Sequence, residues 1–164
     1  MTANGNIYRF TAFAPASRSL LDSLLRLALA ETEVVYGCDQ AWWRNSFGLP
    51  NHPGLKIAYR SAFSHVKTIR IDATADKLLT AEPGLIGSGG NSGFQALNLA
   101  IQFGATRVLL VGFDMSDKHG VHWFGRSQGD GRSQPAEWNF GRWRKAFAAA
   151  SVQAEALGVE ILNA

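Results

Sequence analysis

The most constraining feature of this sequence lies between residues 87 and 112, where a glycine-rich turn, an apolar helix pattern and an apolar strand pattern follow one another. The turn reads GSGGNSG over residues 87–93. Residues 91–103 (NSGFQALNLAIQF) predict a helix that is apolar around most of its circumference and ends at Gly104. Residues 107–111 (RVLLV) predict the strongest strand of the chain, which we expect at the centre of a sheet. Because so apolar a helix must be buried, this stretch predicts a helix packed on a sheet.

Strand and helix patterns alternate along the rest of the chain. The expected strands cover residues 7–13, 33–38, 67–73 and 159–162, and the expected helices run from Ser17 or Ser19 to Glu31 and over residues 134–157. Residues 40–64 are interpreted as a long excursion with one helical turn, and residues 77–86 as a connection. This order predicts an α/β fold with a mostly parallel sheet, in which residues 1–164 form a single domain.

Composition excludes several classes of protein. With 46% hydrophobic and 18% charged residues, the chain has enough apolar material for a core, unlike disordered chains. Its single cysteine, Cys38, excludes internal disulfides and a cysteine zinc site, and no basic neighbour activates it as a nucleophile. No apolar stretch approaches the roughly 20 residues of a membrane span, and residues 1–16 lack the pattern of a signal peptide. We therefore expect a cytoplasmic protein with no membrane partner.

The net charge of +3 is mild, and the whole surplus falls within residues 117–145. Domains that bind nucleic acids usually carry a larger basic excess, so a nucleic-acid partner is not expected. Arg126, Arg132, Arg142 and Arg144 could draw an anionic ligand to this segment, or they could form the solvated face of a helix.

The glycine-rich turn is the first candidate ligand site. Glycines allow the backbone to approach a ligand, and a helix that begins there directs free N–H groups at an anion such as phosphate. The turn lacks the lysine of a P-loop and the full dinucleotide-binding pattern. In the alternative interpretation Asn91 or Ser92 merely caps a core helix. The predicted ligand-binding residues of the turn are Ser88, Gly89, Gly90, Asn91, Ser92 and Gly93.

Asp114 and His122 are the candidate catalytic residues. Asp114 follows the predicted strand 107–111, and open α/β sheets bind ligands at the carboxyl ends of their strands. Its carboxylate could hold a metal ion or a ribose hydroxyl, or it could cap the next loop. His122 could act as a general base or contact a phosphate, because the usual pKa of histidine lies near neutral pH. A zinc cluster with His119 is not expected, and the cofactor stays open, with a divalent cation such as Mg²⁺ as the candidate.

Asp39 and Trp42 follow the predicted strand 33–38 and are the third candidate. Together with Trp43, Trp42 could stack on a base or a sugar ring. Packing of these tryptophans in the core is the alternative.

The segments that carry these residues resemble a known family. Residues 87–125 (GSGGNSGFQALNLAIQFGATRVLLVGFDMSDKHGVHWFG), together with YGCDQAWW, EPGLIGSGGNSGF and VEILNA, resemble the phage-associated proteins called norphogenetic proteins. The resemblance covers roughly residues 33–164. More distantly, the order of helix, strand, GxD and Gly-x-x-His is similar to the 6-hydroxymethylpterin diphosphokinase-like group (domain of unknown function 115) and to family 42 sialyltransferases.

The resemblance implies a Rossmann-like three-layer sandwich that binds a nucleotide or a nucleotide sugar at the carboxyl ends of its strands. It places the turn at residues 88–93, the acidic residue of GxD at Asp114 and the histidine at His122, and the YGCD block adds Asp39. The amino end departs from the pattern, because these families open with a Gly-x-Gly-Pro-Ser type loop that nothing in residues 13–17 matches. We interpret that unit as absent or rebuilt.

Two functions follow as hypotheses. The first is a group transferase, glycosyl or diphosphoryl, in which His122 acts as base or phosphate contact and Asp114 orients a ribose or a divalent ion. The second is a non-catalytic phage accessory protein that acts through protein contacts, which the missing amino-terminal loop favours. A sheet without that first unit leaves an open edge, so we also expect a homodimer.

Overall fold

The computed structural model describes residues 10–12, 32–116 and 135–164, and in these ranges the chain is an α/β protein. A four-stranded sheet has the order β1 (Phe10–Ala12), β2 (Val34–Gly37), β3 (Leu55–Ala58) and β4 (Lys67–Thr68). Two further pairs join β5 (Arg70–Asp72) to β6 (Leu85–Gly87) and β7 (Arg107–Leu110) to β8 (Glu160–Asn163). Each of these pairings is parallel, as the sequence predicted.

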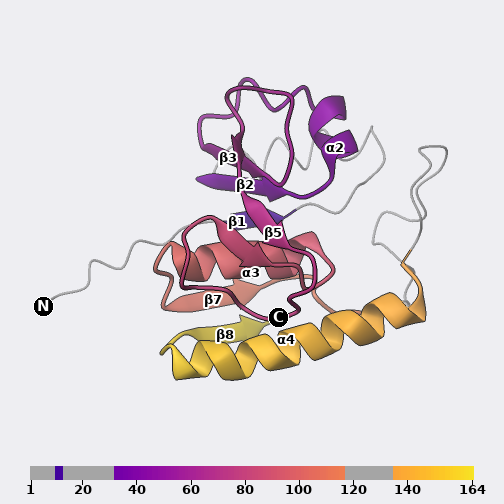
Figure 1. The fold of residues 1–164 in the computed structure, drawn as a ribbon, viewed down its shortest axis with the longest axis vertical. Coiled ribbons are helices and arrows are strands. Elements are labelled where there is room, and N and C mark those ends of the chain that lie inside the picture. The colour runs from indigo at the N-terminus through magenta and orange to yellow at the C-terminus, as the bar shows by residue number, and fades with distance from the viewer. Residues whose placement is uncertain (1–9, 13–31, 117–134) are drawn as a thin grey trace, which may run out of the picture.

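The described helices are α2 (Gln40–Asn45), α3 (Ser92–Gln102) and α4 (Glu137–Ala156). In Figure 1 the upper part of the molecule holds α2, β2 and β3, and the lower part holds α3, β7, β8 and the long helix α4. Helix α3 packs on β1, β2, β6 and α4, so it joins the two parts. The sequence predicted its bounds closely, since Asn91 caps it and Gly104 follows it with a φ of +88°.

Helix α3 contributes to two hydrophobic clusters. Phe94 and Leu97 pack with Ala150 and Ala154 of α4, whereas Ala96 and Leu99 belong to the cluster that contains β2 and β3. Strand β2 is buried on both faces, because Val34 and Tyr36 meet the α3 side while Val35 packs with Trp42 and Trp43 of α2. Buried on all sides, α3 and β2 provide the rigid frame of the glycine-rich turn.

Several predicted elements differ from the structure. The strand expected over residues 67–73 is two strands in separate sheets, and Ile69 between them donates its N–H to the carbonyl of Ala58. Strands β3 and β6 lie in segments interpreted as an excursion and a connection, because Lys56 interrupts the apolar residues of β3 and β6 has only three residues. Strand β7 was expected to be central, but among the described residues it pairs only with β8, and Leu109 is 59% exposed.

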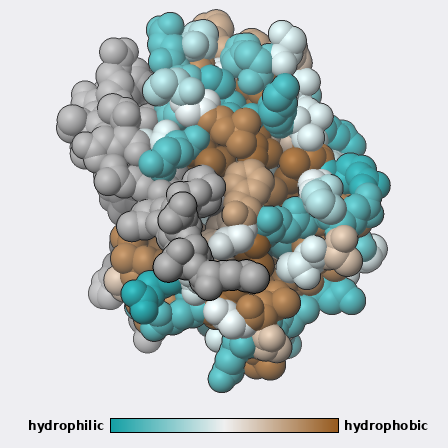
Figure 2. All heavy atoms as spheres, turned by 90° about the vertical axis from the view of Figure 1, so that its left-hand side faces the viewer, coloured by the Kyte–Doolittle hydropathy of each residue, from teal (hydrophilic) through white to brown (hydrophobic). Residues whose placement is uncertain are grey.

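The molecular surface carries apolar as well as polar regions. Figure 2 shows apolar side chains gathered near the middle of one face, with polar side chains around them. No helix in the described ranges combines the length and the apolar character needed to cross a membrane.

Candidate functional site

The carboxyl end of β2 lies directly against the N-terminus of α3. The sulfur of Cys38, the residue after β2, lies 2.9 Å from the hydroxyl oxygen of Ser92, and the backbone N–H of Cys38 donates to the same hydroxyl at 3.4 Å. Burial raises the pKa of the Cys38 thiol, and the hydrogen bond to Ser92 offsets part of that rise. The end of β2 and the glycine-rich turn therefore meet in the fold, with the neutral thiol of Cys38 between them.

The glycine-rich turn presents a row of backbone N–H groups that have no hydrogen-bond partner in the described part of the chain. The side chain of Asn91 accepts a hydrogen bond from the N–H of Phe94 at 2.9 Å. The N–H groups of Asn91, Ser92 and Gly93, by contrast, donate no hydrogen bond to any residue in the described ranges. Three adjacent free donors at the positive end of an 11-residue helix suit an anion such as a phosphate group. The capping interpretation of Asn91 is therefore confirmed, and ligand binding at the turn stays a prediction.

The conformation of the turn requires its glycines. Gly89 and Gly90 have φ angles of +54° and +78°, and a Cβ atom on Gly89 would lie 2.0 Å from the ring of Phe94. Ser88 is held by its N–H, which donates to the carbonyl of Ala75 at 2.7 Å, and its hydroxyl accepts from the N–H of Gly90 at 3.3 Å. The turn is therefore fixed in shape rather than a flexible connection.

Asp39 and Trp42, which the sequence predicted as ligand-binding residues, have structural roles in the fold. The Asp39 carboxylate caps α2, accepting from the N–H of Ala41 at 2.8 Å and from that of Trp42 at 3.4 Å. Trp42 is 8% exposed and stacks edge-on against Trp43, with ring centroids 4.8 Å apart. Its packing matches the core alternative and leaves little of the indole for a ligand, whereas Asp39 keeps a position next to Cys38 at the edge of the turn.

Asp114 lies next to a residue that covers the turn. The ring of Phe113 packs so closely on Gly93 that a Cβ atom there would lie 2.1 Å from it. The next residue, Asp114, is exposed. The backbone carbonyl of Met115 accepts a hydrogen bond from the guanidinium of Arg144 in α4 at 2.9 Å. His122 lies outside the described residues. The residues that contact the start of α3 are therefore Cys38 and Phe113, the chain neighbours of Asp39 and Asp114.

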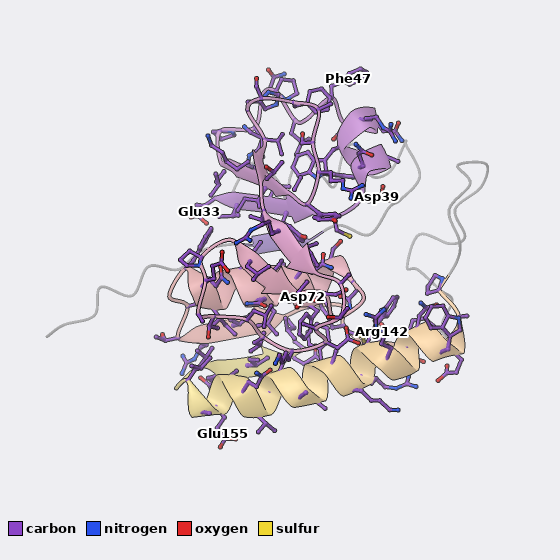
Figure 3. The ribbon with its side chains drawn as sticks, viewed as in Figure 1. Glu33, Asp39, Phe47, Asp72, Arg142 and Glu155 are labelled. Carbon is purple, nitrogen blue, oxygen red and sulfur yellow. The ribbon has the colours of Figure 1, made fainter. Side chains whose placement is uncertain are left out.

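Helix α4 braces the turn through contacts that the sequence did not predict. The indole N–H of Trp143 donates to the carbonyl of Gly90 at 2.9 Å. Arg142 and Asp76 form two parallel hydrogen bonds of 2.7 and 2.8 Å, which lower the pKa of Asp76, and a hydrogen bond from the backbone of Gly89 lowers it further. Figure 3 shows Asp39 and Arg142 on the same side of the molecule. No spacing rule connects residues 66 positions apart, so only the folded chain reveals this pair.

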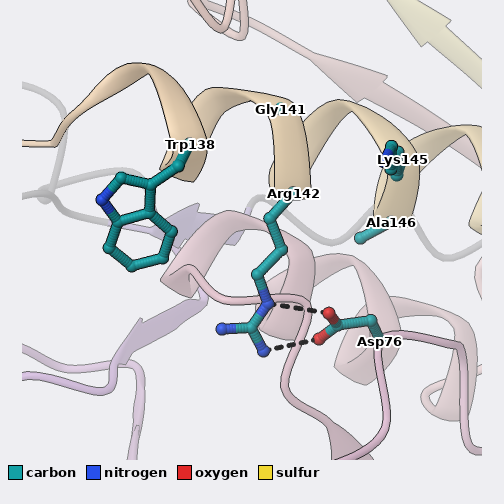
Figure 4. Close-up of a pocket in the computed structure, with 6 residues that line it drawn as sticks. All are labelled: Asp76, Trp138, Gly141, Arg142, Lys145 and Ala146. Carbon is teal, nitrogen blue, oxygen red and sulfur yellow. Dashed lines mark hydrogen bonds and ion pairs between the residues drawn. The ribbon is translucent and has the colours of Figure 1, made fainter.

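A pocket of about 520 Å³ opens beside this ion pair. It is lined by residues of α4 and by Asp76, as Figure 4 shows. Within the described part of the chain, no group of three histidine, cysteine or acidic side chains is arranged to hold a metal ion.

Comparison with known proteins adds no relative. No protein-family model matches the chain, and neither a curated protein nor a solved structure is similar to it.

Proposed function

We propose that this chain is a Rossmann-like three-layer protein that binds a nucleotide or a nucleotide sugar at the turn before α3. The observation that carries the proposal is that the N–H groups of Asn91, Ser92 and Gly93, next to the end of β2, donate to no residue among those the structure describes. Such donors hold a phosphate group without a lysine, which the turn lacks. In this proposal Asp39, which follows Cys38, and Asp114, which follows Phe113, would contact a ribose hydroxyl or a divalent ion at the phosphate.

In this proposal the reaction is the transfer of a glycosyl or diphosphoryl group. His122 acts as the base for the acceptor or as a contact of the leaving phosphate, and Asp114 orients the ribose or the cation. Asp39, already fixed by its bonds to the start of α2, would supply a carboxylate that does not have to be ordered when the ligand binds.

Binding is tested by a thermal-shift panel of nucleoside mono- and diphosphates and nucleotide sugars, with and without Mg²⁺, followed by calorimetry. A ligand at one hundred times its Kd adds about 2.7 kcal/mol to the stability of the folded state, which raises Tm by a few degrees. Asp114→Asn and His122→Ala are expected to reduce or abolish the shift, while the exposed control Glu155→Gln retains it. If the two site variants bind and act like the wild type, these residues have no role in the site.

A second candidate function is a non-catalytic accessory protein that acts through protein contacts. The observation that favours it is that three predicted ligand-binding residues have structural roles. Trp42 is buried, and Asp39 and Asn91 each cap a helix. In that case no nucleotide shifts Tm at any concentration tested.

A further inference from the structure

The pocket between α4 and Asp76 has the chemistry of a site for an aromatic ring that carries an anionic group. Its lining consists of Asp76, Trp138, Gly141, Arg142, Lys145 and Ala146, and its volume of about 520 Å³ lies within the usual range for small-molecule sites. The pocket adjoins the glycine-rich turn, because a Cβ atom on Gly90 would lie 3.3 Å from the central guanidinium carbon of Arg142.

Two flat groups line one end of the pocket. Trp138 is 69% exposed, although the large side chain of tryptophan is mostly buried in folded proteins. One helical turn further on, the guanidinium of Arg142 is held in one plane by its two bonds to Asp76, and Figure 4 shows both side chains directed to the same side of α4. Indole and guanidinium planes are the groups on which proteins stack nucleobases.

The other end of the pocket carries the positive charge of Lys145. Asp76 neutralises Arg142, whereas Lys145 is exposed and forms no ion pair with a residue in the described ranges. A rise of about 1.5 Å per residue places Lys145 roughly 10 Å along the helix from Trp138. Gly141 lies between them, and apart from its chain neighbours and the helix's own backbone no atom lies within 4 Å of the position that its Cβ would occupy. The space between the aromatic end and the cationic end is therefore open.

We propose that this pocket extends the nucleotide site at the turn, with the base stacked on Trp138 beside Arg142 and with the charge of Lys145 attracting the phosphate groups. The inference rests on the proposed function, because it assigns two further parts of the same ligand. It adds residues that neither the sequence patterns nor the turn identified.

The test is calorimetry of the full chain with ADP, with UDP and with ribose 5-phosphate, which carries a phosphate but no base. Trp138→Ala is expected to weaken nucleotide binding roughly tenfold and to leave ribose 5-phosphate unaffected, since stacking is lost only where there is a base. Lys145→Gln is expected to weaken binding of all three probes by a factor of about three to ten. The controls Phe47→Ala and Lys67→Gln remove an exposed aromatic ring and an exposed lysine far from the pocket, and should bind like the wild type.

A third variant separates blocking of the pocket from damage to the fold. Gly141→Leu fills the open space and is expected to abolish nucleotide binding, while its Tm stays unchanged or rises, because leucine is a better helix former than glycine. If the wild type binds ADP or UDP and the three pocket variants bind as tightly, the pocket assignment is wrong and the proposed function stands. If the wild type binds neither nucleotide nor any nucleotide sugar, the proposed function is wrong and the pocket assignment fails with it.

Discussion

The side-chain oxygen of Asn98, in the middle of α3, accepts a hydrogen bond from the backbone N–H of Gly87 at 3.0 Å, so the helix fixes the strand that leads into its own first turn. The same oxygen accepts from the N–H of Leu79 at 2.9 Å, and the amide nitrogen donates to the Leu79 carbonyl at 2.8 Å. Asn98 is fully buried, and its bond to Gly87 is buried as well, whereas its two bonds to Leu79 are partly buried. One amide thus joins the loop between β5 and β6, at Leu79, to the end of β6, at Gly87.

Asn98→Ala is expected to lower the free energy of unfolding by about 3 kcal/mol, because the buried N–H of Gly87 and the partly buried N–H of Leu79 lose their acceptor. Gln153→Ala is the matched control, since its amide bonds to Leu78 in the same way but is only partly buried, and it should cost about 1 kcal/mol. Urea denaturation of both variants measures the difference. Equal losses would mean that burial of Asn98 does not matter.

Two glycines with positive φ angles allow strain and packing to be compared. Gly84 has a φ of +78° and nothing within 4 Å of its Cβ position, so Gly84→Ala should cost about 1–2 kcal/mol from backbone strain alone. Gly89→Ala adds a clash with the buried ring of Phe94 and should cost about 3 kcal/mol or more. Thermal or urea unfolding of both variants tests this ranking. A Gly89→Ala variant that is as stable as Gly84→Ala would contradict it.

The ion pair of Asp76 and Arg142 predicts a dependence of stability on pH. The pKa of Asp76 lies below its usual value of 3.8, so the pair stabilises the folded state above about pH 4, and this contribution is lost as the pH falls through the lowered pKa. Asp76→Asn should cost about 1 kcal/mol or less at pH 7, because both side chains are more than a third exposed. Unfolding curves of the variant and the wild type, with Glu155→Gln as control, should converge as the pH falls through the lowered pKa of Asp76. A gap that stays constant with pH would show that the charge of Asp76 is not the cause.

Cys38 should behave as a buried thiol with little reactivity. Its pKa is raised above the usual 9.0, so its contribution to stability is present below pH 9 and is lost as the pH rises through the raised pKa. The pH profile of alkylation by iodoacetamide should have its midpoint above 9.0, and Ser92→Ala should move the midpoint further up, because the hydroxyl that stabilises the thiolate is lost. A midpoint below 9.0 in the wild type would mean that Cys38 is an activated thiol.

The sequence predicted the elements whose patterns are long or strongly marked. The apolar run of α3, its cap at Asn91 and the glycine after its end all have local causes, and so do the bounds of β2 and α4. Strands β3 and β6 lack an apolar pattern that predicts a strand, because Lys56 interrupts β3 and β6 has only three residues. The outward-facing Leu109 shows that an apolar strand is not always a central one.

The candidate site was predictable only where it depends on local structure. The turn and the position of Asp39 after β2 follow from patterns of a few residues. The contact of Ser92 with Cys38 and the bracing of the turn by Trp143 and Arg142 depend on chain segments more than 50 residues apart. The expected homodimer stays a prediction, which light scattering tests directly.

The central claim, that a phosphate-bearing ligand binds at the start of α3, is tested most directly by ¹H–¹⁵N correlation spectra of the labelled chain during titration with ADP and UDP. The free N–H groups of Asn91, Ser92 and Gly93 report on the site itself. The account predicts saturable chemical-shift changes that are largest at these three amides, with little change at the N–H of Leu109 on the exposed strand β7. Spectra in which the amides of residues 91–93 do not move at saturating ligand would contradict it.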